Sequence, residues 1–201
     1  MPDVELRPGP CLCVVRLAIV PNSDRDAVAA ELATLSQSSG LLDTRSPRRT
    51  SELYAVSPAR VKFRKELIER YLQIGDAPSC DGRSAVLTAG PPGAGKSTLL
   101  ALVADELEGF RQLDADVVKD FLIEHALEDG IYDDILSTIL PDGATLAPRE
   151  IASLVHEEST RLIDQIRELC VERRENVIIE GTLSWPGHGR RSTSIGEKST
   201  A

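Results

Sequence analysis

The sequence predicts an α/β fold in which a parallel sheet is flanked by helices. Short apolar segments at residues 84–89, 110–113 and 176–180 have the composition of buried strands and alternate with stretches of helical periodicity. A glycine-rich motif joins the first of these strands to the helix that follows it. Strands that alternate with helices are typical of parallel sheets with helical crossovers.

Composition and charge narrow the class of protein. The chain has 201 residues, 41% of them hydrophobic but only 3% aromatic, so we expect an aliphatic core. The net charge of −9 argues against general binding to a nucleic-acid backbone, which requires a positive surface. The longest apolar run, residues 11–21, contains Arg16 and is too short to span a membrane. Asp3 and Glu5 precede it where a signal peptide carries positive charge, so we expect a cytoplasmic protein.

Residues 1–50 form an N-terminal extension with weak signals. Residues 12–20 favour a strand, and residues 27–35 favour a helix capped near Asn22. Residues 36–50 are rich in Ser, Gly, Arg and Pro, which is typical of a linker. We therefore place this extension outside the main domain.

The main domain is predicted over residues 51–185. Ser57 and Pro58 form a helix start, with Ser as N-cap and Pro as the first helical residue, and the apolar spacing continues to about residue 73. Further helices are predicted over residues 96–108, residues 116–127 and a long stretch that begins at Pro148. The composition of residues 186–201 is that of a disordered tail.

A phosphate-binding loop lies between the first strand and the next helix. It matches the pattern G-x-x-x-x-G-K-[ST] with Gly90, Pro91, Pro92, Gly93, Ala94, Gly95, Lys96 and Ser97, and Thr98 follows. Glycines let the backbone turn its N–H groups inward around phosphate, and the helix N-terminus adds positive charge. Lys96 is the expected ligand of the β- and γ-phosphates and Ser97 the expected ligand of Mg²⁺. The motif and its context predict a sheet of the P-loop NTPase type that binds ATP or GTP.

Acidic residues follow the second strand at Asp114 and Asp116. Ligands of open α/β sheets bind at the carboxyl ends of the strands, so a carboxylate here is suited to accept a proton during phosphoryl transfer. Position alone leaves a second interpretation open, in which either residue caps the next helix.

Two further glutamates lie where apolar residues are expected. Glu180 ends the third strand, and an unpaired buried carboxylate is costly, which favours a functional role. Glu158 falls on the apolar face of the long helix, so we expect its side chain to point into the site.

The phosphate loop, residues 113–116 and residues 177–182 together resemble the zeta toxin family in their order and spacing. The resemblance covers about residues 57–185. It implies a P-loop kinase of a toxin–antitoxin system that uses ATP and Mg²⁺ to phosphorylate the 3′-hydroxyl of UDP-N-acetylglucosamine. It also implies an antitoxin protein as a possible partner.

The resemblance also assigns roles to single residues. It implies that Asp116 is the catalytic base, with Lys96 and Ser97 at the nucleotide and Mg²⁺ positions. Glu180 and Thr182 match contacts to the sugar nucleotide, and Asp164 falls where the family has a further acidic substrate contact.

The sequence departs from the family pattern near residue 185. Ser184 and Trp185 stand where the family has an arginine, and the later strands and arginines of the family have no counterpart. We therefore expect a partial, C-terminally truncated kinase domain of uncertain activity. The alternatives are another small-molecule P-loop kinase and an ATP-binding remnant without catalysis.

Overall fold

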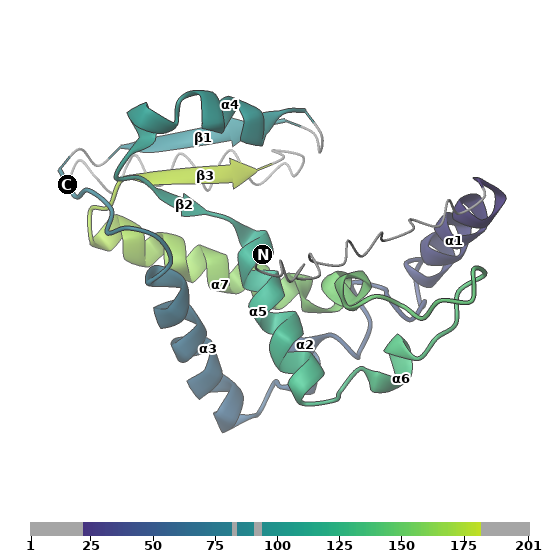
Figure 1. The fold of residues 1–201 in the computed structure, drawn as a ribbon. Coiled ribbons are helices and arrows are strands. Elements are labelled where there is room, and N and C mark those ends of the chain that lie inside the picture. Colours follow the sequence, from purple (N-terminus) through teal and green to yellow (C-terminus); the bar gives the residue numbers. More distant parts are fainter. Residues whose placement is uncertain (1–21, 82–83, 91–93, 182–201) are drawn as a thin grey trace, which may run out of the picture.

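The computed structural model describes residues 22–81, 84–90 and 94–181, and its helices and strands alternate along the chain (Figure 1). The helices are α1 (Asn22–Leu35), α2 (Thr50–Leu53), α3 (Pro58–Leu72), α4 (Lys96–Leu102), α5 (Ala115–Glu128), α6 (Asp133–Leu136) and α7 (Ala152–Glu172). The strands are β1 (Ala85–Ala89), β2 (Arg111–Leu113) and β3 (Val177–Gly181), and the 3-10 helices are η1 (Ala104–Leu107) and η2 (Pro148–Ile151). The predicted strand at residues 12–20 and the predicted tail at residues 186–201 lie outside the described residues.

All described strands belong to one parallel sheet with the order β1-β3-β2. This confirms the predicted α/β class and the positions of the three predicted strands. The predicted burial of the first strand is wrong, because Leu87 of β1 is 42% exposed. In the register, Ala89 lies opposite Gly181 and Leu113 lies opposite Ile179. The carboxyl ends of the strands therefore meet at one edge of the sheet, where ligands of such sheets bind.

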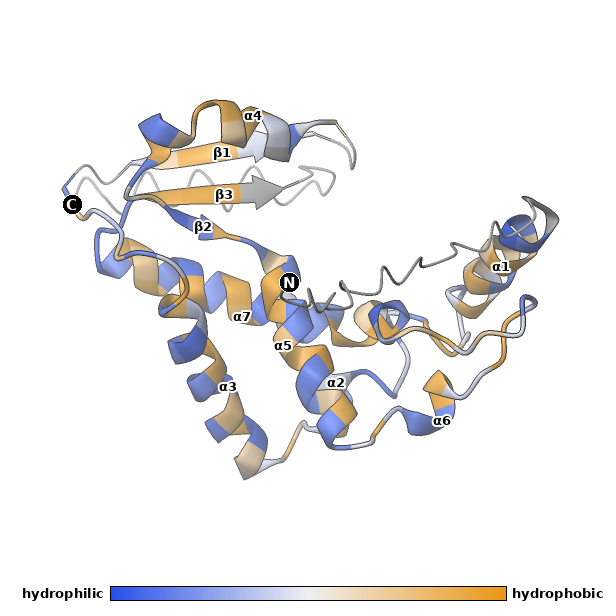
Figure 2. Ribbon diagram, in the orientation of Figure 1, coloured by the Kyte–Doolittle hydropathy of each residue, from blue (hydrophilic) through white to orange (hydrophobic). Residues whose placement is uncertain are grey.

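Helices flank the sheet: in the view of Figure 1, α4 lies next to β1, and α3, α5 and α7 lie beyond β2. α7 is amphipathic, as its periodicity predicts, and hydrophobic and hydrophilic residues alternate along it (Figure 2). Val177 and Ile179 of β3 belong to the main core cluster, which the apolar face of α7 shares. Within the described part of the chain, no helix has the length and apolar character needed to cross a bilayer.

The helix predicted over residues 96–108 is shorter than expected. α4 ends at Leu102, and a 3-10 helix and a turn at Gly109 follow. Leu99 and Leu102 are 59% and 79% exposed, so this segment lacks the buried apolar face that stabilises most protein helices. The long helix also starts later than predicted, because Pro148 opens the 3-10 helix η2 and α7 begins at Ala152.

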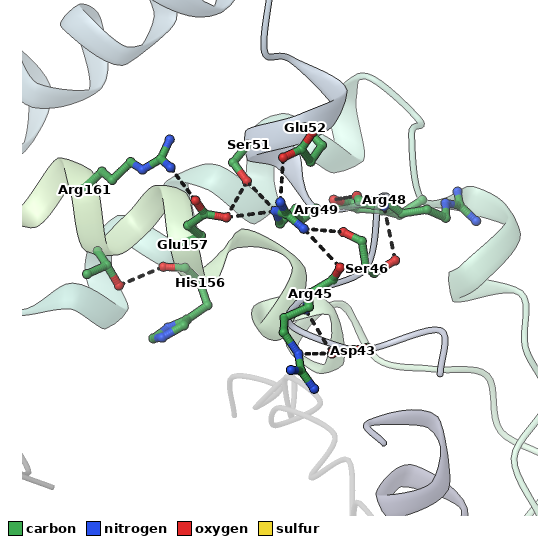
Figure 3. Close-up of polar contacts among 12 residues, drawn as sticks. Asp43, Arg45, Ser46, Arg48, Arg49, Ser51, Glu52, His156, Glu157 and Arg161 are labelled. Atoms are coloured by element: carbon green, nitrogen blue, oxygen red, sulfur yellow. Dashed lines mark hydrogen bonds and ion pairs between the residues drawn. The ribbon is translucent and has the colours of Figure 1, made fainter. Parts of the chain in front are cut away.

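Residues 36–50 do not behave as a free linker. They form a series of turns, and Leu42 is buried in the core cluster. Arg49 forms an ion pair of 2.8 Å with Glu157 of α7, and the Ser51 hydroxyl donates to the same carboxylate (Figure 3). Arg48 pairs with Asp134 of α6 at 2.7 Å. This segment is therefore fastened to the main domain, and the boundary at residue 50 stays a prediction.

Candidate functional site

The described part of the phosphate loop joins the end of β1 to the start of α4. Gly95, immediately before α4, has a φ of 79°, which is a left-handed conformation that glycine adopts without strain. Lys96 is the first residue of α4, and its Nζ donates to the carbonyl oxygen of Gly90 at 2.8 Å. Pro91, Pro92 and Gly93 lie outside the described residues.

The described ends of the loop, at Gly90 and Ala94, lie close together. A Cβ at Gly90 would lie 3.3 Å from the Cβ of Ala94 and 3.8 Å from the side chain of Lys96. The Lys96 amino group lies at the same end of the loop, beside the Gly90 carbonyl oxygen. These residues fit the phosphates of a nucleotide, with Lys96 as the cation that would hold them. The assignments of Ser97 to Mg²⁺ and of Thr98 to the nucleotide stay predictions. Within residues 22–81, 84–90 and 94–181, no cluster of His, Cys, Asp or Glu side chains is arranged to hold a metal ion.

The two aspartates after β2 have different structural positions. Asp114 is the N-cap of α5, and its Oδ1 accepts a hydrogen bond of 2.8 Å from the backbone N–H of Asp116. Asp116 lies in the first turn of α5, and its side chain is exposed. Capping is therefore performed by Asp114, and Asp116 is not the N-cap of α5.

One basic side chain contacts the Asp116 carboxylate directly. Lys119, one turn later on α5, donates to Oδ1 of Asp116 at 2.7 Å. This hydrogen bond is the main cause that lowers the pKa of the Asp116 carboxyl below its ordinary 3.8. Partial burial raises this pKa, and the charges of Lys119, Arg149 and His156 lower it by smaller amounts. Burial lowers the pKa of His156. Asp116 is therefore ionised near neutral pH, which is the state that a proton acceptor needs.

The sequence analysis did not identify Lys119 as a partner of the Asp116 carboxylate. The available signal was its spacing, because a lysine three residues after an aspartate shares a face with it on a helix.

We expect Lys119→Met to raise the pKa of the Asp116 carboxyl toward 3.8, because the variant removes the hydrogen bond that stabilises the carboxylate. A ¹³C NMR titration of the Asp116 carboxyl measures the change. Lys65→Met, on α3, is the control and should leave the titration unchanged. An unaltered Asp116 titration in Lys119→Met would contradict this electrostatic account.

Glu180 lies on β3 opposite Thr88 and directly before the strand's last residue. Its backbone therefore reaches the edge of the sheet at which two segments begin: the phosphate loop, and the connection from β2 through Asp114 to α5, called here the Asp114 turn. Thr182 lies outside the described residues. The substrate roles of both residues stay predictions.

Glu158 is buried on α7, as its helical position predicts, and is 2% exposed. Its two oxygens accept hydrogen bonds from Arg60, at 3.0 Å and 2.9 Å. Arg64 donates to Oε1 at 2.6 Å. Arginines of α3 thus engage both oxygens of the carboxylate, and this pairing explains its burial without a bound substrate. A substrate contact at Glu158 stays a prediction.

Asp164 lies farther along α7 and forms an ion pair with Arg167. Because α7 leads into the start of β3, this position is farther than Glu158 from the carboxyl edge of the sheet. Its assignment as a substrate contact also stays a prediction.

Comparison with known proteins identifies one family. The family model described as zeta toxin matches residues 69–198, which is more than half of the chain. The match includes the phosphate loop, the two aspartates after β2 and strand β3. No curated protein matches the chain.

Proposed function

Because this chain belongs to the zeta toxin family, whose members are P-loop kinases that use ATP, we propose that it phosphorylates a sugar nucleotide. In this proposal the γ-phosphate of ATP is transferred to a hydroxyl of an acceptor such as UDP-N-acetylglucosamine. A protein antitoxin is a further proposed partner, and it rests on family membership alone.

One observation carries the kinase proposal. The phosphate loop follows β1 and the Asp114 turn follows β2, and both strands end at the same edge of the parallel sheet. The proposed phosphate-binding element and an ionised carboxylate therefore lie at the same edge of the sheet. Phosphoryl transfer needs both, one to hold the donor and one to activate the attacking hydroxyl.

The proposed chemistry divides between these groups. Lys96 neutralises charge on the transferring phosphoryl group, and Asp116 accepts the proton of the acceptor hydroxyl. As the new P–O bond forms, the bond between the γ-phosphorus and the bridging oxygen breaks, and ADP leaves. Ser97 is the proposed ligand of Mg²⁺, and Glu180 and Thr182 are the proposed contacts to the sugar nucleotide.

Purified protein incubated with ATP, Mg²⁺ and UDP-N-acetylglucosamine provides the direct test. We expect ADP and a phosphorylated sugar nucleotide, detected by mass spectrometry. Transfer of phosphate to a different hydroxyl compound would contradict the proposed acceptor but would support the proposed kinase activity. Binding of ATP without transfer to any acceptor would contradict the proposed activity.

We expect Asp116→Asn to lower the rate of phosphotransfer by about 10²–10⁴-fold, because general-base catalysis contributes about this much. ATP affinity should be unchanged, because the phosphate loop is intact. The matched control is Asp120→Asn, one turn later on α5, where an exposed carboxylate pairs with Arg149. Equal turnover in Asp116→Asn and the wild type would remove Asp116 from the mechanism.

A further inference from the structure

A buried tyrosine of α3 contacts the turn that carries the proposed base. Tyr71 is 3% exposed, and its ring belongs to the core cluster. Its hydroxyl accepts a hydrogen bond of 2.8 Å from the backbone N–H of Asp114. The same hydroxyl lies within donating distance of the Gln112 and Asp114 carbonyl oxygens, at 3.2 Å and 3.3 Å. One side chain therefore contacts the backbone on both sides of Leu113, where β2 ends.

The position of β2 explains why this contact matters. Among the described strands, β2 lies at an edge of the sheet and pairs only with β3. Beyond Leu113 the chain leaves the sheet and, through Asp114, enters α5. The ladder to β3 therefore does not extend along the turn, and Tyr71 supplies a hydrogen-bond donor and acceptor there.

The end of α3 is itself held in place. Arg111 of β2 donates to the carbonyl oxygen of Leu72 at 2.9 Å, next to Tyr71. The Arg111 guanidinium is buried and pairs with Glu175 at 2.7 Å. Burial raises the pKa of Tyr71 to about 12, so its hydroxyl keeps its proton across the working pH range. The hydroxyl is thus able to act both as a hydrogen-bond donor and as an acceptor at this turn.

We propose that Tyr71 is a positioning residue for phosphotransfer, which holds the Asp114 turn so that the first turn of α5 presents the Asp116 carboxylate in one orientation. The inference rests on the proposed function of Asp116. Two hydrogen bonds connect Tyr71 to Asp116. The Tyr71 hydroxyl accepts from the backbone N–H of Asp114, and the Asp114 carboxylate accepts from the backbone N–H of Asp116.

Tyr71→Phe tests this role because it keeps the ring and removes only the hydroxyl. Tyr132→Phe is the matched control, since Tyr132 is 0% exposed and its hydroxyl also donates to a backbone carbonyl, that of Arg48, at 2.7 Å. Two readouts are measured in each variant: the steady-state constants kcat and KM for phosphotransfer, and hydrogen exchange of the Asp114 amide.

We expect Tyr71→Phe to lower kcat by about 10–100-fold, the range expected for a misplaced catalytic group, with KM for ATP unchanged. The Asp114 amide should exchange faster, because it loses its hydrogen-bond acceptor. Tyr132→Phe should leave both quantities at wild-type values even if it lowers the melting temperature. A merely structural role for Tyr71 predicts similar kinetics in the two variants.

The outcomes separate this inference from the proposed function. If the wild type is active and Tyr71→Phe keeps its kcat, the positioning role is overturned and the kinase assignment stands. If the wild type transfers phosphate to no acceptor, the proposed function fails together with the catalytic part of the inference, and amide exchange decides whether Tyr71 holds the Asp114 turn. In that case, unchanged exchange at Asp114 overturns the structural part as well, and faster exchange confined to residues 112–116 supports that part alone.

Discussion

Replacing Glu158 with glutamine should lower the free energy of unfolding by about 3–5 kcal/mol, the cost of removing one partner from a buried ion pair. The substitution keeps the size of the side chain but leaves the Arg60 guanidinium, which is 0% exposed, without its countercharge. That guanidinium also packs against the rings of Tyr54 and Phe63, at 4.3 Å and 4.5 Å, so it has no easy route to solvent. Denaturant unfolding followed by circular dichroism measures the loss.

Glu157→Gln is the matched control on the same helix. Its carboxylate pairs with Arg49 and Arg161 but lies at the surface, where an ion pair contributes at most about 1 kcal/mol. If Glu157→Gln and Glu158→Gln lowered the free energy of unfolding by similar amounts, burial would not determine how much these ion pairs stabilise the protein.

The stability of the wild type should depend on pH through Glu158. Burial raises the pKa of this carboxyl, but hydrogen bonds from Arg60 and Arg64 help to bring the net value below the ordinary 4.5. A group whose pKa is depressed in the folded state stabilises the protein above its unfolded pKa, and this contribution disappears as the pH falls. Glu158→Gln should therefore flatten the loss of stability below about pH 4.5.

The same variant tests the predicted substrate contact. At a temperature where Glu158→Gln remains folded, a purely structural carboxylate predicts an unchanged KM for the sugar nucleotide. A raised KM for the sugar nucleotide with normal ATP binding would support the predicted substrate contact at Glu158.

Replacing Lys96 with alanine should abolish measurable ATP binding and lower phosphotransfer by at least about 10³-fold, the lower range for loss of a phosphate-clamping cation. Lys96 begins α4, and its amino group lies at the Gly90 carbonyl, at the start of the loop. Calorimetric titration with Mg-ATP measures the affinity.

Lys62→Ala controls for the loss of a positive charge. Lys62 is exposed on α3, where it pairs loosely with Glu66 at 3.6 Å, and its removal should change neither affinity nor turnover. Wild-type ATP affinity in Lys96→Ala would refute the assignment of the loop as the nucleotide site.

The strands and the amphipathic helices were predictable because their signals are local. A short apolar run bounded by turn residues predicts a strand at residues 176–180. Val177 and Ile179 of this strand lie in the core cluster. Likewise, the spacing of α7 predicts that Glu158 is buried. The end of α4 was not predictable, because it depends on whether Leu99 and Leu102 find a surface to pack against.

For the candidate site, the sequence by itself determined the phosphate loop and the position of the aspartates at a strand end, because each is a short motif whose chemistry depends on neighbouring residues. Tertiary structure decided the partners. Arg60 meets Glu158 across 98 positions of sequence, and Tyr71 meets Asp114 across 43. Helical periodicity predicts that a side chain faces inward. The packing of α3 against α7 and β2 determines which group that side chain contacts, and no local sequence pattern encodes this packing.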